Sequence, residues 1–312
     1  MARLGRTDLD VFPLCLGGNV FGWTADEDQS RAVLDAYADA GGNFIDTANS
    51  YLVEHGQSES IIGRWLADRD DAEQIVVATK VGGGRGALRN LRAETIEREA
   101  HASLERLKRE RIDLYYAHFD DRETPLEETV AAFDSLVRQG LVRHIAASNY
   151  SADRLTAALE LQRERGLAEF TVLEPHYNLV EREFEWTLLP VAEDFDLAVL
   201  PYFALAKGFL TGKYRPDGEA VDSQRAEAAR AYLDSGGAAV LDTLDLLAAA
   251  HRTTVPAVAL AWLRAQPRVI APIASARNTE QLEQILPAAT LELSPSEIEQ
   301  LTASSDALAR WT

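Results

Sequence analysis

Four side chains of complementary chemistry stand at or just beyond the ends of short apolar runs. The runs at residues 43–46, 75–79 and 112–117 lead to Asp46, Tyr51, Lys80 and His118. Each run has the length and composition of a short buried strand. Ionisable groups gathered at the C-terminal ends of several strands are typical of the active site of a parallel α/β barrel.

A phenol, an ammonium, a carboxylate and an imidazole can together deliver one proton to a reacting oxygen. A free phenol has a pKa of about 10, too high for an efficient acid near neutrality, and a neighbouring ammonium lowers it. We therefore predict that Lys80 lowers the pKa of Tyr51 and that Asp46 holds Lys80 by an ion pair. His118 is expected to orient a substrate carbonyl. The set favours carbonyl reduction; the alternative is a core tyrosine beside a structural ion pair.

Alternation of short apolar runs with amphipathic segments predicts the elements that position these side chains. Strands are expected at residues 14–18, 43–46, 75–79, 112–117, 142–147, 170–173, 197–201 and 269–272. Helices with apolar residues three or four apart are expected at residues 27–40, 58–66, 95–107, 126–138 and 152–163. Strands separated by helices imply parallel pairing through right-handed crossovers.

A closed barrel is preferred over an open sheet. An open dinucleotide-binding sheet would show Gly-x-Gly-x-x-Gly after its first strand, whereas Leu16-Gly17-Gly18 leads here to Asn19 and Val20. The prediction is an α/β fold, a (β/α)8 TIM barrel that forms one domain over residues 1–312. Residues 3–12 are expected to form a hairpin that plugs its N-terminal mouth. Residues 203–223 and 293–312 are expected to be long loops on the C-terminal face, where they would shape substrate binding.

Charge and composition exclude several classes of function. The net charge of −19 argues against a nucleic-acid or anionic-membrane partner. The single cysteine, Cys15, forms no internal disulfide and no thiolate metal site. Neither a signal peptide nor an apolar run of about 20 residues is visible. A cytoplasmic protein without a bound metal is expected, acting on a small molecule as a monomer or homo-oligomer.

Several ordered segments resemble one known family. They are Leu4-Gly5-Arg6-Thr7, Leu16-Gly17-Gly18, residues 43–51 through Asp46 to Tyr51, Gly56-Gln57-Ser58-Glu59, Lys80-Val81, residues 113–118, Ser148-Asn149-Tyr150, Tyr177-Asn178-Leu179 and residues 208–214. With these segments the chain resembles the aldo-keto reductase superfamily almost end to end. Residues 208–214 are similar to its bacterial and potassium-channel-β-like branches.

The resemblance implies an oxidoreductase that reduces an aldehyde or ketone with NADPH, forming NADP+, with Tyr51 as proton donor; NADH is the alternative cofactor. It implies that Ser148 and Asn149 hold the nicotinamide carboxamide and that Tyr202 stacks on the ring. Further implied cofactor contacts are Glu174, Lys207, Gly208, Leu210, Lys213, Ser275, Arg277 and Gln281. Lys207 to Lys213 would lie at the pyrophosphate. Ser275 and Arg277 would bind the adenosine 2′-phosphate, and a guanidinium there favours NADPH.

Two positions depart from the family pattern. Glu174 stands where the family usually carries Gln, and a carboxylate only accepts hydrogen bonds whereas Gln also donates. Ile285 stands where the family often has Asn, and it cannot hydrogen-bond adenine. The grip on the carboxamide and on adenine is therefore expected to differ from the family's, while the four catalytic candidates are intact.

Other interpretations remain open. Trp23, Phe119 and Trp311 are candidates for the wall of an apolar substrate pocket, or they pack the loops. The glycine-rich residues 82–86 lack the Lys-Ser/Thr of a phosphate loop and are expected to be a flexible loop near the site mouth. A cofactor-binding sensor or regulatory subunit with little turnover is the main alternative function. A metal-dependent barrel hydrolase using Asp46, His118 and His176 is a third, although the His-x-His pair usual in such sites is missing.

Overall fold

A closed parallel sheet forms the centre of the molecule. The structure is a computed structural model that describes residues 1–51, 55–84, 90–216, 218 and 226–309. In this part of the chain one eight-stranded sheet has the order β10-β3-β4-β5-β6-β7-β8-β9, and each neighbouring pair is parallel. Its strands are β3 Cys15–Gly17, β4 Phe44–Asp46, β5 Val76–Val81, β6 Ile112–Ala117, β7 Val142–Ser148, β8 Phe170–Glu174, β9 Ala198–Val199 and β10 Ile273–Ala274.

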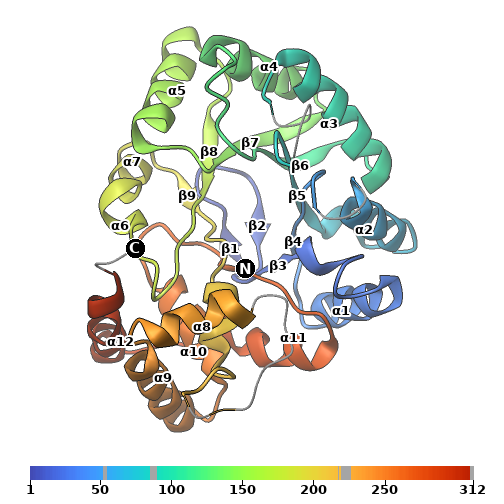
Figure 1. Cartoon of the computed structure of the whole chain (residues 1–312). Helices are drawn as coiled ribbons and strands as arrows, with labels where there is room; N and C mark the ends of the chain where they lie inside the picture. Colours follow the sequence, from blue (N-terminus) through green and yellow to red (C-terminus); the bar gives the residue numbers. More distant parts are fainter. Residues whose placement is uncertain (52–54, 85–89, 217, 219–225, 310–312) are drawn as a thin grey trace.

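Helices surround this sheet (Figure 1), which confirms the predicted (β/α)8 barrel. They are α1 Glu27–Asp39, α2 Gln57–Ala67, α3 Ala93–Leu107, α4 Leu126–Arg138, α5 Ala152–Arg165, α6 Phe184–Thr187, α7 Leu189–Asp194, α8 Ala226–Asp234, α9 Ala238–His251, α10 Val255–Arg264, α11 Thr279–Ile285 and α12 Pro295–Ala309. Short 3-10 stretches are η1 Gly18–Val20, η2 Ala72–Gln74, η4 Ala206–Thr211 and η5 Leu286–Ala289. The five helices expected before residue 170 form within two residues of their predicted bounds.

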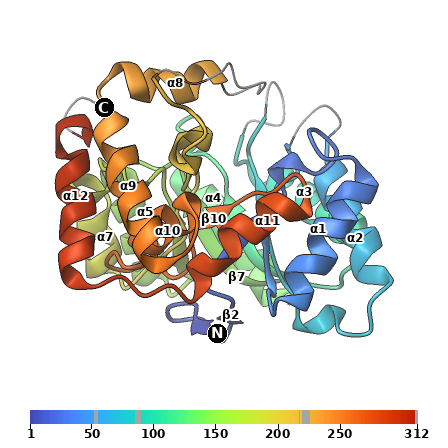
Figure 2. The same ribbon diagram turned by 90° about the horizontal axis from the view of Figure 1, so that it is seen from below.

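The barrel interior is filled by every second residue of the strands, because successive strand side chains point to opposite faces. Leu114 and Tyr116 of β6 belong to this inner cluster, whereas Tyr115 packs outward. The antiparallel hairpin of β1 Ala2–Arg3 and β2 Asp10–Val11 adds Leu4 and Leu9 to the inner cluster. Figure 2 shows this hairpin at the end of the barrel opposite to α8. The predicted plug of the N-terminal mouth is therefore confirmed.

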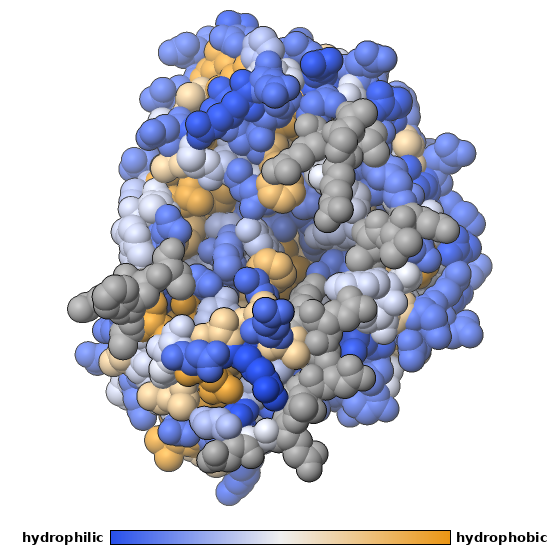
Figure 3. Space-filling model, in the orientation of Figure 1, coloured by the Kyte–Doolittle hydropathy of each residue, from blue (hydrophilic) through white to orange (hydrophobic). Residues whose placement is uncertain are grey.

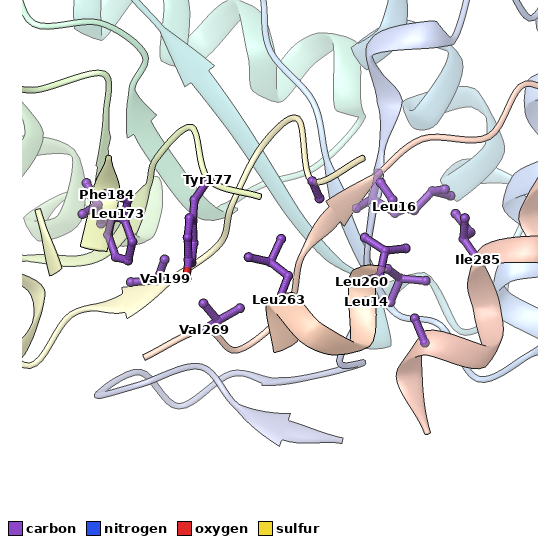
Figure 4. Close-up of a cluster of buried hydrophobic side chains, with 14 of the residues drawn as sticks. Leu14, Leu16, Leu173, Tyr177, Phe184, Val199, Leu260, Leu263, Val269 and Ile285 are labelled. Atoms are coloured by element: carbon purple, nitrogen blue, oxygen red, sulfur yellow. The ribbon is translucent and has the colours of Figure 1, made fainter. Parts of the chain in front are cut away.

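A larger apolar layer joins the outer face of the sheet to the helices. In Figure 4, Leu14 and Leu16 lie beside Leu260 of α10 and Ile285 of α11, and all four side chains are buried. Burial of this kind stabilises a fold by about 25 cal/mol for each Å² of apolar surface removed from water. This layer holds the strands in place from outside and leaves their C-terminal ends to carry polar groups.

Two predicted elements differ from the structure. The last strand is β10 Ile273–Ala274 instead of residues 269–272. Pro272 has no N–H to donate to a strand ladder, and its carbonyl oxygen accepts from the Cys15 N–H at 2.9 Å. The C-terminal segment expected as a loop is mostly the helix α12, which packs beside α9. Its start is capped by Ser294, whose hydroxyl accepts from the Glu297 N–H while the Glu297 carboxylate accepts from the Ser294 N–H.

Among the described residues, no single helix has both the length and the apolar composition needed to cross a membrane. The helices α9 and α10 meet that criterion only as a pair, and the pair is bent by 96°.

Candidate active site

The fold brings the four candidate catalytic side chains together at the C-terminal end of the barrel. Asp46 is the last residue of β4, Lys80 lies near the end of β5, and His118 follows directly after β6. These three strands are neighbours and run in parallel, so their ends meet. Tyr51 lies in the segment after β4 and its hydroxyl reaches back to Asp46.

Lys80 is the centre of this cluster, and its side chain is fully buried. Its ammonium donates to Asp46 Oδ1, to the Thr47 carbonyl oxygen at 3.0 Å and to the Tyr51 hydroxyl at 3.2 Å. The Tyr51 hydroxyl donates in turn to Asp46 Oδ2 at 3.3 Å. The Tyr51 hydroxyl is therefore held between a cation and a carboxylate. The cation favours loss of its proton, and the carboxylate accepts a hydrogen bond from it.

The buried charges act on one another strongly. Burial by itself lowers the pKa of Lys80, but the Asp46 and Glu174 carboxylates outweigh burial and hold that pKa well above its usual range. Burial raises the pKa of the Tyr51 phenol, and the Lys80 ammonium opposes this rise. Lys80 thus acts in the predicted direction, but burial outweighs it, so the net pKa of Tyr51 is raised. Tyr51 keeps its proton near neutral pH.

His118 is neutral at the same pH. Burial, assisted by the Lys80 ammonium, lowers the pKa of its imidazole to about 3. Its Nδ1 lies 3.4 Å from the Ser50 hydroxyl, and its ring stacks on Phe119 with 4.9 Å between ring centroids. The Tyr51 ring stands edge-on to it at 6.0 Å. A neutral imidazole in this place can donate or accept a hydrogen bond but carries no readily lost extra proton.

Glu174 brings a second carboxylate to Lys80. It ends β8, its side chain is 4% exposed, and its Oε2 lies 3.4 Å from Lys80 Nζ. That oxygen has no hydrogen-bond partner among the described residues. Burial, followed by repulsion from Asp46, raises the pKa of Glu174 to about 8. Sequence reasoning considered Glu174 only as a contact to a cofactor and missed its place beside the lysine.

A polar network lies beside this cluster at the ends of β7 and β9. The Ser148 hydroxyl donates to the Glu174 carbonyl oxygen at 2.8 Å. The Asn149 amide donates to Ser148 Oγ and to the His118 carbonyl oxygen, and its Oδ1 accepts from the Tyr202 hydroxyl at 2.8 Å. The Tyr202 ring stacks on His176 with 5.4 Å between ring centroids. These three sequence-predicted residues are therefore adjacent, next to the four catalytic candidates.

The segment after β9 carries the predicted pyrophosphate contacts, but it does not bring all of their side chains to one place. The backbone of η4 has positive φ at Lys207 (57°) and Gly208 (100°), which breaks the helix there. A Cβ on Gly208 would lie 3.9 Å from Lys213 Nζ, so these two positions are side by side. Leu210 is fully buried, so only its backbone is available to a ligand. Lys207 instead lines a cavity of ≈ 530 Å³ between η4, α8 and α12.

The predicted adenosine contacts follow β10. The Ser275 hydroxyl donates to Asn19 Oδ1 at 2.6 Å. Arg277 is partly exposed, and its backbone N–H donates to Gln281 Oε1 at 3.1 Å, while the start of α11 is capped by Asn278, whose Oδ1 accepts from the Gln281 N–H at 3.0 Å. Ile285 is buried in the apolar layer, at 4% exposure, and faces the core instead of a ligand.

The predicted substrate wall is described in part. Phe119 stacks on His118, and Trp23 lies partly buried in the segment after β3, whereas Trp311 falls outside the described residues. Figure 3 shows a few apolar residues in the middle of this face of the molecule, among hydrophilic ones, and further apolar residues toward its edges. The Phe119 and Tyr51 rings, both in contact with His118, give the described part of this wall an aromatic lining.

Sequence reasoning also missed Gly83 beside His118 and the contacts made by the segment after β4. A Cβ on Gly83 would lie 2.3 Å from His118 Nδ1, so glycine allows the backbone to approach the imidazole closely. Gly83 was expected only as part of a flexible loop. Beyond Tyr51, His55 Nε2 lies 2.9 Å from the Glu99 carboxylate, which also accepts from Asn49 at 2.9 Å. No motif spacing links Glu99 of α3 to Asn49 and His55, which lie 50 and 44 positions before it in the sequence.

No group of three or more Cys, His, Asp or Glu side chains within the described ranges is arranged to hold a metal ion.

Comparison with known proteins agrees with this architecture. The sequence pattern of the aldo/keto reductase family matches residues 13–306. The oxidoreductase YrpG of Bacillus subtilis is 35% identical over 300 residues, which cover 93% of this chain and 91% of that protein. The aldo-keto reductase ausK of Aspergillus calidoustus is 33% identical, with 95% and 79% covered. A Saccharomyces cerevisiae protein named as an aryl-alcohol dehydrogenase, AAD14, is 31% identical, with 93% and 82% covered. The chain therefore belongs to the aldo/keto reductase family of oxidoreductases.

Proposed function

We propose that this protein reduces an aldehyde or ketone to an alcohol with NADPH, with Tyr51 as the proton donor. The observation that carries the proposal is the Tyr51 hydroxyl, which contacts both Lys80 Nζ and Asp46 Oδ2 at the C-terminal end of the barrel. Active sites of this barrel class lie at that end. We further propose that the whole chain acts as one domain.

The polar network beside the cluster supports a nicotinamide site. Asn149 adopts a left-handed backbone conformation, with φ of 56°, which is uncommon outside glycine and brings its amide to both His118 and Tyr202. The buried Glu174 Oε2 has no hydrogen-bond partner among the described residues, and the N–H of a nicotinamide carboxamide could donate to it. Ser148, Asn149 and Glu174 would hold the carboxamide and Tyr202 would cover the ring. Bound NADPH would supply the hydride that reduces the carbonyl carbon.

The chain's own groups then handle the proton. Tyr51 donates its hydroxyl proton to the carbonyl oxygen as negative charge develops there. Lys80 stabilises the phenolate that remains, since an adjacent cation is most effective in a site that excludes water. His118 is neutral and has its Nδ1 at Ser50, so its Nε2 is the nitrogen proposed to hydrogen-bond the carbonyl oxygen.

The test is NADPH consumption by the wild type and Tyr51→Phe against aromatic and aliphatic aldehydes and ketones. We expect the variant to lose turnover by about 10³-fold, because a positioned general acid contributes in that range. Its NADPH affinity should stay within about twofold of the wild-type value, because the substitution removes only the hydroxyl group, which has no proposed contact with the cofactor. Equal turnover in the two proteins would refute the mechanism. Binding of NADPH without turnover of any substrate would instead favour a sensor.

Preference for NADPH is proposed to depend on Arg277. Its partly exposed guanidinium follows β10, next to Ser275. Arg277→Ala should weaken NADPH by about tenfold to a hundredfold, the value of one or two charge-assisted hydrogen bonds, and should leave NADH affinity unchanged. Dissociation constants from cofactor fluorescence decide this, with Arg264→Ala as the control because that guanidinium binds the Ala288 and Leu291 carbonyl oxygens. An unchanged preference in Arg277→Ala would contradict the assignment.

The substrate class is proposed to include aromatic carbonyl compounds. The support is Phe119, which stacks on His118, and Trp23, which lies partly buried in the segment after β3, together with relatives named as aryl-alcohol dehydrogenases. Higher kcat/KM for aromatic than for aliphatic aldehydes of equal size is the expected result.

A further inference from the structure

The second carboxylate on Lys80 gives this site a charge imbalance. Asp46 and Glu174 both face one ammonium, and all three side chains are at most 4% exposed. If both carboxylates were ionised, the group would carry a net negative charge with almost no solvent to disperse it, which is costly. Two like charges this close are usually relieved when one proton is shared between them.

The environment of Glu174 supports a shared proton. Burial, followed by repulsion from the Asp46 carboxylate, raises the pKa of Glu174 to about 8, and burial also raises the pKa of Asp46 against the opposing effect of the Lys80 ammonium. The titratable groups that act on Glu174 or feel its charge come from several strands and loops of the barrel: Cys15, Asp46, Tyr51, Lys80, Tyr116 and Tyr202. Burial raises the pKa values of the thiol and the three phenols, so these groups remain neutral. The carboxyl proton is therefore the most readily lost proton of this cluster.

Glu174 also lies where a change of charge is expected during the reaction. Its backbone binds Ser148, and burial together with its charge raises the pKa of Tyr202 to about 12. Ser148 and Tyr202 are the residues proposed to hold the nicotinamide, so this inference depends on the proposed function. The oxidised nicotinamide ring carries a positive charge and the reduced ring carries none.

We propose that Asp46 and Glu174 share one proton in the cofactor-free protein, and that binding of NADP+ expels it while binding of NADPH does not. The carboxyl O–H bond breaks, its electron pair stays on the carboxylate, and the proton passes to solvent. The resulting carboxylate balances the positive ring. Glu174 is thus a residue that selects the redox state of the cofactor, a role that the neutral amide of Gln cannot perform.

Calorimetric titration in two buffers of different ionisation enthalpy measures the protons released on binding. NADPH is the matched control, since it has the same phosphates and an uncharged ring. At pH 7 the wild type should release up to about one more proton with NADP+ than with NADPH, and this difference should disappear well above the pKa of Glu174. Equal release with both cofactors in the wild type would overturn the proposal, whatever the variants do.

Three variants locate the proton. Glu174→Gln should abolish the difference and weaken NADP+ relative to NADPH by about tenfold, the equivalent of one pKa unit. Tyr51→Phe should retain the difference, and Glu181→Gln, a carboxylate outside the Lys80 cluster, should retain it too. Loss of the difference in Tyr51→Phe together with its persistence in Glu174→Gln would assign the proton to the phenol and refute the proposal. If neither cofactor binds the wild type, the proposed function itself fails.

Discussion

Two buried carboxylate–cation groups in this molecule are built in opposite ways. Between α2 and α3, Glu59 accepts from Thr79 Oγ1 at 2.5 Å and from Arg106 Nε at 2.6 Å, so each carboxylate oxygen has a partner. The Arg106 side chain is 19% exposed and keeps some hydration. Inside the barrel, Lys80 is fully buried between two carboxylates, and one oxygen of Glu174 has no hydrogen-bond partner among the described residues.

The difference separates a structural pair from the group that we propose to be functional. A satisfied ion pair holds two helices in place and gains nothing from a ligand, whereas an unsatisfied one stores a free-energy cost that a ligand or a proton can relieve. One carboxylate of each group comes from the same stretch of sequence, since Asp46 and Glu59 are only thirteen positions apart. The segment that carries the family resemblance between residues 43 and 59 therefore contributes one carboxylate to the structural pair and one to the Lys80 cluster.

The largest effect expected is on turnover when the barrel cation is removed. Lys80→Met should lower kcat by about 10⁴-fold, because the phenolate that remains after proton transfer then has no adjacent cation. The free energy of unfolding should fall by less than the free energy that corresponds to the loss of kcat, since the Asp46 and Glu174 carboxyl groups can take up protons when the ammonium is gone. Steady-state kinetics and thermal unfolding measured together test this. Arg106→Met is the matched change in the other pair, and loss of turnover there equal to that of Lys80→Met would break the comparison.

A smaller effect, on stability, is expected when the scaffold pair is broken. Glu59→Ala leaves the Arg106 guanidinium and the Thr79 hydroxyl without their buried partner. The free energy of unfolding should fall by about 3–5 kcal/mol, with kcat changed by less than about threefold at temperatures where the variant is folded. Urea denaturation gives the first quantity. A stability loss below about 1 kcal/mol would show that Glu59 is as dispensable as a surface charge.

The smallest effect expected is a pH dependence of stability that requires Glu174 beside Asp46. Its pKa is raised to about 8 in the folded protein, so between the unfolded value of about 4.3 and that pH the folded chain binds more protons than the unfolded chain. Stability therefore falls as pH rises through this window. Glu174→Gln should remove on the order of 2 kcal/mol of that fall between about pH 5 and pH 8. Parallel stability curves for the two proteins would contradict the charge imbalance.

The barrel was predictable because its signals are local. Short apolar runs and helical spacing placed β4, β6 and α4 at their observed ends within one residue. The prediction for residues 293–312 failed because Ser305 interrupts the apolar stripe of α12 between Leu301 and Leu308. The Ser294–Glu297 capping pair was the sequence signal that could have located this helix.

The candidate site was predictable in its members and not in its energetics. Strand ends and family motifs pointed to Asp46, Tyr51 and Lys80, which the structure brings together. The charge state could not be read from the sequence, since it depends on the burial of Tyr51 and on Glu174 arriving from β8, far along the chain. The close approach of Gly83 to His118 likewise depends on how neighbouring strand ends meet.

The two ends of the sheet meet at a weakly paired seam. Strands β9 and β10 have two residues each, and beside the seam Val199 and Val269 form an isolated bridge, with Ile270 N–H donating to the Val199 carbonyl oxygen at 3.1 Å. The proposed cofactor segments leave the barrel on opposite sides of this seam, one after β9 and one after β10. A dinucleotide that contacts both segments would hold β9 and β10 together. Cofactor binding would therefore stabilise the closed barrel against separation of these two strands. Amide hydrogen exchange at the seam would then report directly on how much cofactor the protein carries.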